Sequence, residues 1–125
     1  MGTNCLMDTN VLIDMQMGRL QGNGLTFVVQ TVNAHFIVSF ITQIEFLGYK
    51  YVTQQSEEFI SFAEVIEINQ TIIQHCIGLR KNAAIKLPDA IIAATALTNN
   101  LTLVTNNEKD FKNIDGLKVI NPHKL

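Results

Sequence analysis

Short apolar runs alternate along the chain with longer segments in which apolar residues recur at the spacing of a helix. The short runs are rich in β-branched and aromatic residues, which favours strands, and they occupy residues 4–7, 35–40, 65–68, 101–105 and 117–120. The helical pattern covers residues 9–17, 25–34, 42–49, 56–63, 70–84 and 88–98, and the Gly-Asn-Gly sequence at 22–24 is expected to be a turn. This alternation predicts βαβ units, and therefore an α/β fold with a parallel sheet and helices on both faces.

Glycine, proline and asparagine mark the ends of several predicted helices. Gly18 is expected to end the first helix. Pro88 opens the last long helix at the first position, where proline is favoured, and Asn99 and Asn100 end it. The alanines of that helix would allow it to approach a sheet closely.

Polar residues with catalytic potential follow the predicted strands. Asp8 comes directly after the first strand, and Asn107 follows the fourth. Glu45 is expected in the first turn of the helix after the second strand, and Asp89 lies in the first turn of the helix that Pro88 opens. Ligands of open parallel sheets bind at the carboxyl ends of the strands, so these four residues form the candidate site.

Each of the four also has a structural explanation when it is taken alone. Asp8 can cap the following helix by accepting a hydrogen bond from a backbone N–H. Thr42 and Glu45 match the capping box Ser/Thr-x-x-Glu. Asp89 is favoured by the helix macrodipole, and Asn107 can begin a turn. Their expected convergence at one edge favours a functional site over four separate structural roles.

Clustered carboxylates repel one another, and their pKa values rise unless a cation neutralises them. Oxygen ligands suit Mg²⁺ or Mn²⁺, so Asp8, Glu45 and Asp89 are the expected metal ligands. The remaining acids are interpreted mostly as parts of solvated faces or loops: Asp14, Glu57, Glu58, Glu64, Glu67, Glu108, Asp110 and Asp115.

The composition fits a single domain over residues 1–125, since 47% of the residues are hydrophobic and 16% are charged. A net charge of −2 means that bulk positive charge cannot hold a nucleic acid, which leaves a local patch or metal-bridged phosphates. Cys5 and Cys76 lie in apolar surroundings and indicate buried, reduced thiols in a cytoplasmic protein. The pattern predicts neither a secretory signal nor a membrane-spanning helix.

Other catalytic chemistries lack support in the sequence. The chain contains no GxSxG, P-loop or GxGxxG motif. His35, His75 and His123 do not show the spacing of metal ligands. A haloacid-dehalogenase-like phosphatase would need a second aspartate two residues after Asp8, where Asn10 stands instead.

Four segments, in this order, resemble PIN domains and look most like VapC-type toxins, the ribonuclease components of bacterial and archaeal toxin–antitoxin pairs. The segments are MDTNVLID, SFITQIEFLGY, LPDAIIAATAL and LTLVTNNEKDF, and the resemblance extends over nearly the whole chain. It implies a three-layer α/β/α sandwich with a five-stranded parallel sheet.

The resemblance implies an acidic site of Asp8, Glu45 and Asp89 that binds Mg²⁺ or Mn²⁺ and hydrolyses RNA phosphodiester bonds. Asn107 stands at a fourth catalytic position, which is often aspartate in the family. Because Asn107 supplies an amide there, we expect at most one tightly held metal ion in the free protein. The resemblance also implies supporting residues. Thr9 or Asn10 orients Asp8, Thr105 contributes a hydroxyl, and Asp110 is close enough in sequence to substitute for Asn107.

The resemblance further implies three partners: an RNA substrate, a cognate antitoxin that covers an apolar groove, and a second copy of the chain in a homodimer. Exposed Phe and Ile residues within 46–62 are candidates for that groove and, equally, for the core. The alternative function is a catalytically weak or inactive PIN-fold module that binds RNA or protein, and Asn107 is the residue that favours it.

Overall fold

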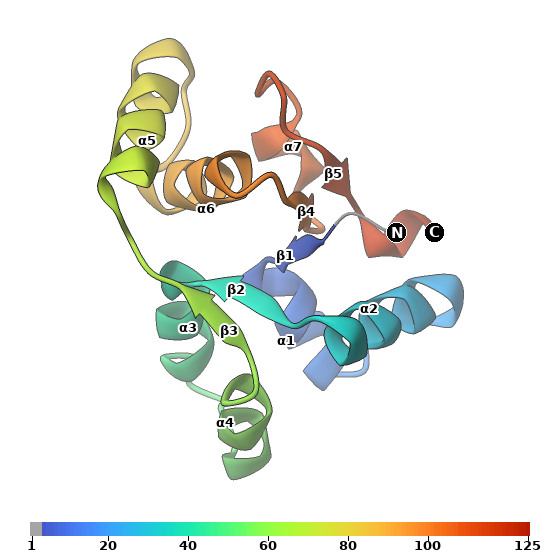
Figure 1. Cartoon of the computed structure of the whole chain (residues 1–125). Helices are drawn as coiled ribbons and strands as arrows, with labels where there is room; N and C mark the ends of the chain where they lie inside the picture. Colours follow the sequence, from blue (N-terminus) through green and yellow to red (C-terminus); the bar gives the residue numbers. More distant parts are fainter. Residues whose placement is uncertain (1–3) are drawn as a thin grey trace.

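The structure, a computed structural model, describes residues 4–125 and shows the predicted alternation of strands and helices (Figure 1). The strands are β1 (Cys5–Met7), β2 (Ile37–Ser39), β3 (Glu64–Ile66), β4 (Thr102–Val104) and β5 (Val119–Ile120). The helices are α1 (Thr9–Gln16), α2 (Gly22–Ala34), α3 (Phe40–Leu47), α4 (Gln54–Ile60), α5 (Gln70–Asn82), α6 (Leu87–Thr98), α7 (Glu108–Phe111) and the 3₁₀ helix η1 (Pro122–Lys124). Every strand pair is parallel, which confirms the predicted α/β class.

The five strands do not form one continuous hydrogen-bonded sheet, so the expected five-stranded sheet is corrected. Hydrogen bonds join β1, β4 and β5 in the order β1-β4-β5, and they join β2 to β3 separately. β1 and β2 still lie side by side. Each strand has only two or three residues, so a small divergence between two neighbours is enough to remove the ladder.

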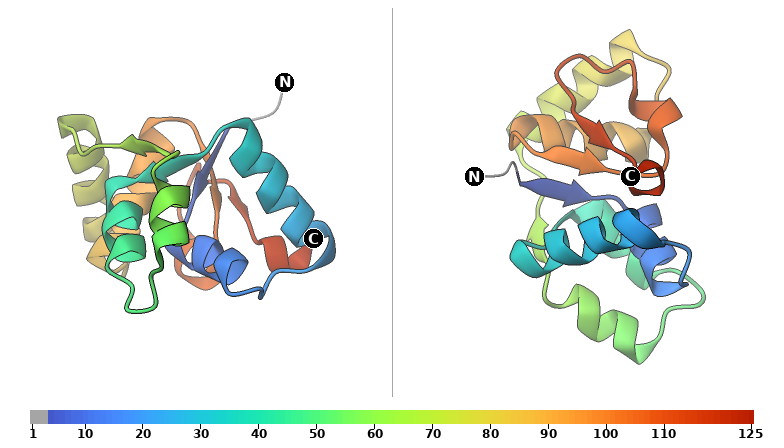
Figure 2. Two further views of the ribbon diagram at one scale, coloured as in Figure 1. Left: turned by 90° about the horizontal axis from the view of Figure 1, so that it is seen from below. Right: turned by 90° about the vertical axis from the view of Figure 1, so that its right-hand side faces the viewer.

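Helices cover both faces of the strands, and the molecule has three layers (Figures 1 and 2). Neighbouring residues of a strand point to opposite faces, and β1 shows this directly. Leu6 packs into a core with α5, α6 and α7, whereas Met7 packs into a second core with α1, α2, α3 and α4. Both residues are completely buried, which explains why the strands are continuous apolar runs rather than alternating ones.

Two predicted boundaries are wrong. The Gly-Asn-Gly sequence is not a turn between elements, because it forms the first turn of α2. α3 begins at Phe40, earlier than expected, since the hydroxyl of Ser39 accepts a hydrogen bond from the backbone N–H of Thr42 and so caps the helix. Thr42 is therefore not the cap of a capping box, and Glu45 lies in the second turn of α3 rather than in the first.

Three further features complete the description. Helices α7 and η1 were not predicted, and both are too short to show a periodic apolar pattern. Cys5 and Cys76 are buried, as expected. Within residues 4–125, none of the helices combines the length and the apolar character needed to cross a membrane.

Candidate active site

Asp8 lies at the carboxyl end of β1, at the edge of the sheet where the sequence places the candidate site. Its backbone N–H donates to the carbonyl of Val104 at 2.9 Å, which continues the pairing of β1 with β4 by one residue. Its carboxylate accepts the N–H of Thr9 at 2.8 Å and caps α1. The capping role and a catalytic role are therefore compatible in one side chain, because only one of its two oxygens is used by the cap.

The second carboxylate oxygen of Asp8 is held by residues that come from two different elements. Oδ2 accepts a 2.8 Å hydrogen bond from the hydroxyl of Thr105, which follows β4, and a 3.1 Å hydrogen bond from the side-chain amide of Asn10 in α1. The same amide lies 3.3 Å from the Thr105 hydroxyl. The structure thus brings the predicted supporting residues Asn10 and Thr105 into direct contact with Asp8.

Burial dominates the electrostatics of Asp8. The side chain is 5% exposed, and desolvation raises the pKa of its carboxyl group to about 6. The hydrogen bonds from Thr105 and Thr9 oppose this rise, whereas the negative charges of Glu45 and Asp89 add to it. Asp8 therefore lies in a site with an excess of negative charge that its hydrogen-bond donors do not fully compensate.

Glu45 reaches this site from α3 although it lies outside the first turn. The hydroxyl of Thr9 donates a 2.6 Å hydrogen bond to Glu45 Oε1, and the same hydroxyl contacts that of Thr42 at 3.2 Å. Thr9 directly follows Asp8, so its hydroxyl links the segment that carries Asp8 to the second candidate acid, Glu45. In this structure it contacts Glu45 through its side chain and Asp8 through its backbone.

Asp89 lies in the first turn of α6, as predicted. Its carboxyl group is half-buried, and desolvation raises its pKa. Asp110 and Glu45 raise that pKa further through their charge, while Lys86 lowers it. Asp110 was interpreted as part of a solvated loop, but its charge acts directly on one of the candidate acids.

Asn107 directly precedes α7, and the partner of its side chain is Asp110 rather than one of the three candidate metal ligands. Its Nδ2 atom donates a 2.7 Å hydrogen bond to Asp110 Oδ2. Its backbone N–H donates to the Thr105 hydroxyl at 3.1 Å. Asn107 and Asp110 therefore act as a pair. The neutral amide of Asn107 does not cancel the charge of the Asp110 carboxylate, but the hydrogen bond fixes the position of that carboxylate.

The donor chemistry of the site fits a hard divalent cation. Asp8, Glu45 and Asp89 offer carboxylate oxygens, and their mutual repulsion is the condition that a cation relieves. Among residues 4–125, however, no three His, Cys, Asp or Glu side chains are arranged as a ready metal site. The residues supply suitable ligands without forming a closed cage.

Asp14, Asn106 and His123 lie directly behind the site, although none of them was predicted to belong to it. Asp14 was interpreted as solvated, but it is 7% exposed and contacts Asn106 and His123. Asn106 also donates its backbone N–H to the side chain of Asn10. One signal in the sequence pointed this way, since Asn10 and Asp14 are four residues apart and so share a face of α1.

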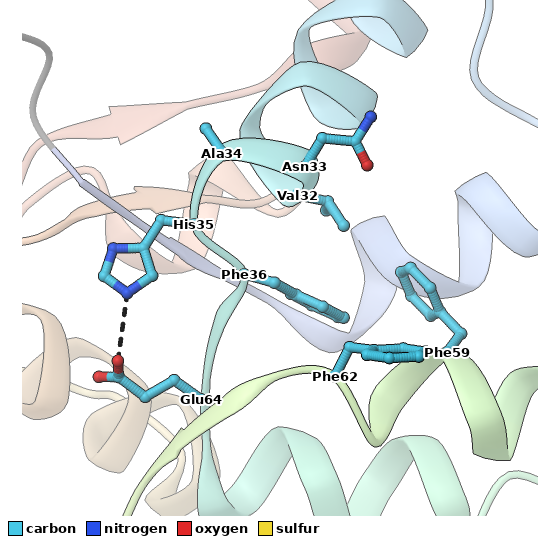
Figure 3. Close-up of a pocket in the computed structure, with 8 residues that line it drawn as sticks. All are labelled: Val32, Asn33, Ala34, His35, Phe36, Phe59, Phe62 and Glu64. Atoms are coloured by element: carbon cyan, nitrogen blue, oxygen red, sulfur yellow. Dashed lines mark hydrogen bonds and ion pairs between the residues drawn. The ribbon is translucent and has the colours of Figure 1, made fainter.

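A cavity of about 440 Å³, drawn in Figure 3, is not lined by Asp8, Glu45 or Asp89. It is lined by residues that precede β2, including Phe36, and by two aromatic residues of the α4 region, Phe59 and Phe62. Because the strands are parallel, these residues stand at the amino ends of β2 and β3, opposite the edge that carries Asp8. Phe62 is 82% exposed, whereas Phe46 and Ile60 are core residues, so only part of the expected groove within 46–62 is accessible.

Comparisons with known proteins agree with this fold. The family model described as PIN domain matches residues 5–117. A chain of a toxin–antitoxin complex from Klebsiella pneumoniae is 35% identical, with a TM-score of 0.74, and the match covers 94% of this chain and 97% of that one. A chain of VapBC-1 from nontypeable Haemophilus influenzae is 28% identical, with a TM-score of 0.74 and coverage of 94% and 96%.

One more solved structure supports the fold alone. A chain of DNA-bound VapBC from Salmonella typhimurium is 22% identical, with a TM-score of 0.75, and the match covers 97% of this chain and 99% of that one. The comparison with curated proteins gave no match.

Proposed function

The chain belongs to the PIN domain family, with VapC-type toxins as its structural relatives, and from this premise we propose that it is a metal-dependent endoribonuclease. We propose further that it is the toxin of a type II toxin–antitoxin pair and acts in the cytoplasm. The observation that carries the proposal is the electrostatic coupling of Asp8, Glu45 and Asp89 at the carboxyl edge of a parallel sheet. Raised carboxyl pKa values in such a position are typical of functional sites.

A divalent cation, Mg²⁺ or Mn²⁺, held by Asp8, Glu45 and Asp89 would supply Lewis acidity toward water and the scissile phosphate. The chain's own residues prepare the ligands. Thr105 and Asn10 orient one oxygen of Asp8, while Thr9 holds Glu45.

The charge of the site also determines how RNA can bind. A phosphodiester carries a negative charge, and the uncompensated carboxylates would repel it. These carboxylates would therefore bind RNA more tightly when they hold a cation, and removal of the cation is expected to weaken both binding and cleavage. This dependence agrees with a chain whose net charge of −2 gives no general attraction for nucleic acid.

The test is cleavage of RNA by the purified protein. Cleavage is expected with Mg²⁺ and should stop on addition of a chelator. Asp8→Asn and Asp89→Asn should each abolish cleavage while circular dichroism shows an intact fold. Asp115→Asn is the matched control, because Asp115 is exposed and precedes β5, toward the amino ends of the parallel strands and opposite the edge that carries Asp8. Wild-type rates for both site variants would reject the assignment.

A second candidate function is a PIN-fold module with weak or no catalysis that binds RNA or protein. The observation that favours it is Asn107, whose amide donates to Asp110 where a carboxylate could otherwise coordinate a metal ion. A protein that binds Mn²⁺ and RNA but cleaves none of a broad set of RNAs would support this second function over the first.

An antitoxin is the proposed protein partner, since the Klebsiella pneumoniae relative comes from a toxin–antitoxin complex. Two features offer an apolar surface near α4. Phe62 is largely exposed and lines the cavity of Figure 3. A smaller cavity of about 160 Å³ lies between α1, α3 and α4 and is lined in part by Met17 and Tyr51, both of which are about half exposed.

A homodimer is the proposed assembly, and α5 and α6 together carry the surface that supports it. An open, largely apolar depression of about 500 Å³ is lined by Ile68, Ile73, Ile77, Leu87 and Ile91. Ile77 is 43% exposed and Leu87 is 52% exposed. Contiguous exposed apolar residues of this kind are unfavourable in a monomer and mark interaction surfaces.

A further inference from the structure

Asp14 is a buried carboxylate that the proposed metal site does not use. It is 7% exposed, and three side chains surround it, two of which come from distant parts of the chain. Its Oδ2 atom lies 2.7 Å from Asn106 Nδ2 and 2.7 Å from His123 Nε2. Arg19, which is more than half exposed, lies 3.7 Å from Oδ1. A carboxylate can be buried only when donors replace the lost water, so Asn106 and His123 are its principal partners.

Asn106 extends this contact to the candidate active site. Its backbone N–H donates to Asn10 Oδ1 at 3.1 Å, and this hydrogen bond fixes which way the amide of Asn10 faces. With its oxygen so engaged, Asn10 turns its Nδ2 atom toward Asp8 Oδ2 at 3.1 Å. A continuous series of hydrogen bonds therefore leads from His123, through Asp14, Asn106 and Asn10, to the carboxylate of Asp8.

The C-terminal turn that carries His123 is itself fixed. The side chain of Asn121 accepts the N–H of His123 at 3.0 Å and caps η1. η1 packs against the start of α2, as Figure 2 shows from two sides. The contact is close enough that a Cβ atom at Gly24 would come within 2.9 Å of the carbonyl carbon of Pro122. His123 is thus presented to Asp14 by a turn that has little freedom to move.

We infer that Asp14, Asn106 and His123 form a clasp that positions the carboxylate of Asp8, and that His123 is a positioning residue for the proposed ribonuclease. The inference rests on the proposed function for its catalytic consequence. Oδ2 of Asp14 is a carboxylate oxygen and accepts, so Nε2 of His123 is the donor of their 2.7 Å hydrogen bond. Without that donor Asp14 has lost one of its two principal partners and its carboxylate can turn toward water, which weakens its hydrogen bond with Asn106 and the hold of Asn106 on the amide of Asn10.

The experiment compares His123→Ala with His123→Gln, whose side-chain amide returns a donor near the position of Nε2. His75→Ala is the matched control, because His75 is exposed on α5 and its ring forms a hydrogen bond with Thr98, away from Asp14 and Asn106. RNA cleavage at saturating Mg²⁺ is measured for each protein. His123→Ala is expected to lower kcat about tenfold with little change in KM, as when an outer residue supports a metal ligand. His123→Gln should recover most of the rate, and the control should behave as wild type.

A second readout does not depend on catalysis. In the wild-type protein the side-chain amide of Asn10 is held by Asp8 and Asn106, so its NMR signals should differ from those of a solvated amide. They should shift toward the solvated position in His123→Ala and return in His123→Gln. Thermal unfolding of each variant shows whether the fold is retained.

The outcomes separate the clasp from the proposed function. A wild-type protein that cleaves no RNA would reject the proposed function, while the Asn10 signals would still test the clasp. His123→Ala with unchanged Asn10 signals and an unchanged kcat would overturn the clasp and leave the ribonuclease intact. A loss of rate that His123→Gln does not recover, with unmoved Asn10 signals, would also overturn it.

Discussion

The hydroxyl of Thr9 donates a 2.6 Å hydrogen bond to Oε1 of Glu45, and this contact joins α1 to α3 across the candidate site. The two residues are far apart in the sequence, yet Thr9 stands directly after Asp8. Glu45, which α3 supplies, is therefore held next to Asp8, which directly follows β1. The hydrogen bond explains how Glu45 contributes from the second turn of its helix.

The first prediction concerns Thr9→Val, which keeps the shape of the side chain and removes its donor. Loss of one partly buried hydrogen bond is expected to lower the free energy of unfolding by about 1 kcal/mol. RNA cleavage should fall more than stability suggests, because Glu45 loses the contact that orients it. Chemical denaturation and cleavage assays measure the two effects. Thr9→Ser, which retains the hydroxyl, is the control and should cleave almost as wild type.

The second prediction concerns pH and Asp8, with chelator present. Burial raises the pKa of Asp8 to about 6 from an ordinary value of 3.8, so the folded protein binds the proton more tightly than the unfolded chain does. The resulting stabilisation is complete below about pH 4 and is lost as the pH rises through 6.

Asp8→Asn mimics the protonated form and keeps a good helix cap. It should therefore raise the free energy of unfolding by up to about 3 kcal/mol at pH 7, and the gain should shrink toward zero near pH 4. Urea denaturation at several pH values measures it. An equal effect of the substitution at pH 4 and pH 7 would contradict the assignment of a raised pKa.

The third prediction concerns Asn107→Asp. The new carboxylate would face Asp110 across a contact that is now 2.7 Å between amide and carboxylate. Repulsion and the lost hydrogen bond should destabilise the metal-free protein by on the order of 1 kcal/mol. In return, the additional oxygen ligand should increase Mn²⁺ binding from one ion per chain to two. Titration calorimetry gives the stoichiometry, and two ions already bound to the wild-type protein would refute the one-ion prediction.

The fourth prediction concerns Gly24→Ala. A methyl group there would overlap the backbone of Pro122, which must move away and take His123 with it. The expected destabilisation is about 1–3 kcal/mol, together with faster proteolysis of the C-terminal residues.

Gly78→Ala is the control for the fourth prediction. Gly78 lies inside α5, and a Cβ atom there meets nothing within 4 Å. Alanine at that position should stabilise the helix by up to about 1 kcal/mol. If both substitutions stabilise the protein, the close packing of η1 on α2 is not as described.

The fifth prediction concerns the proposed homodimer. Ile77→Lys places a charge on the exposed apolar surface of α5 and should convert a dimer into a monomer without loss of stability in the monomeric state. Val29→Lys is the control, since Val29 has a similar exposed fraction but lies on α2. Sedimentation equilibrium measures the assembly. A wild-type protein that is monomeric at high concentration would remove the basis of the proposal.

The pattern of apolar residues was sufficient to predict the strands, most helices and the parallel arrangement. It misplaced the start of α3, because the cap depends on the hydroxyl of Ser39 and not on the apolar spacing. It also missed the division of the strands into two hydrogen-bonded groups. Pairing between short strands depends on backbone spacing, which side-chain patterns do not report.

For the site, the sequence by itself determined that Asp8 follows a buried strand and that Asp89 lies in the first turn of a helix, since both follow from local patterns. Only the tertiary structure decided that Thr9 holds Glu45 and that Asp14 is buried behind the site with Asn106 and His123. The physical reason is that a carboxylate looks the same in the sequence whether water or a distant donor solvates it. Burial, and the hydrogen bonds that make burial possible, exist only once remote segments pack together.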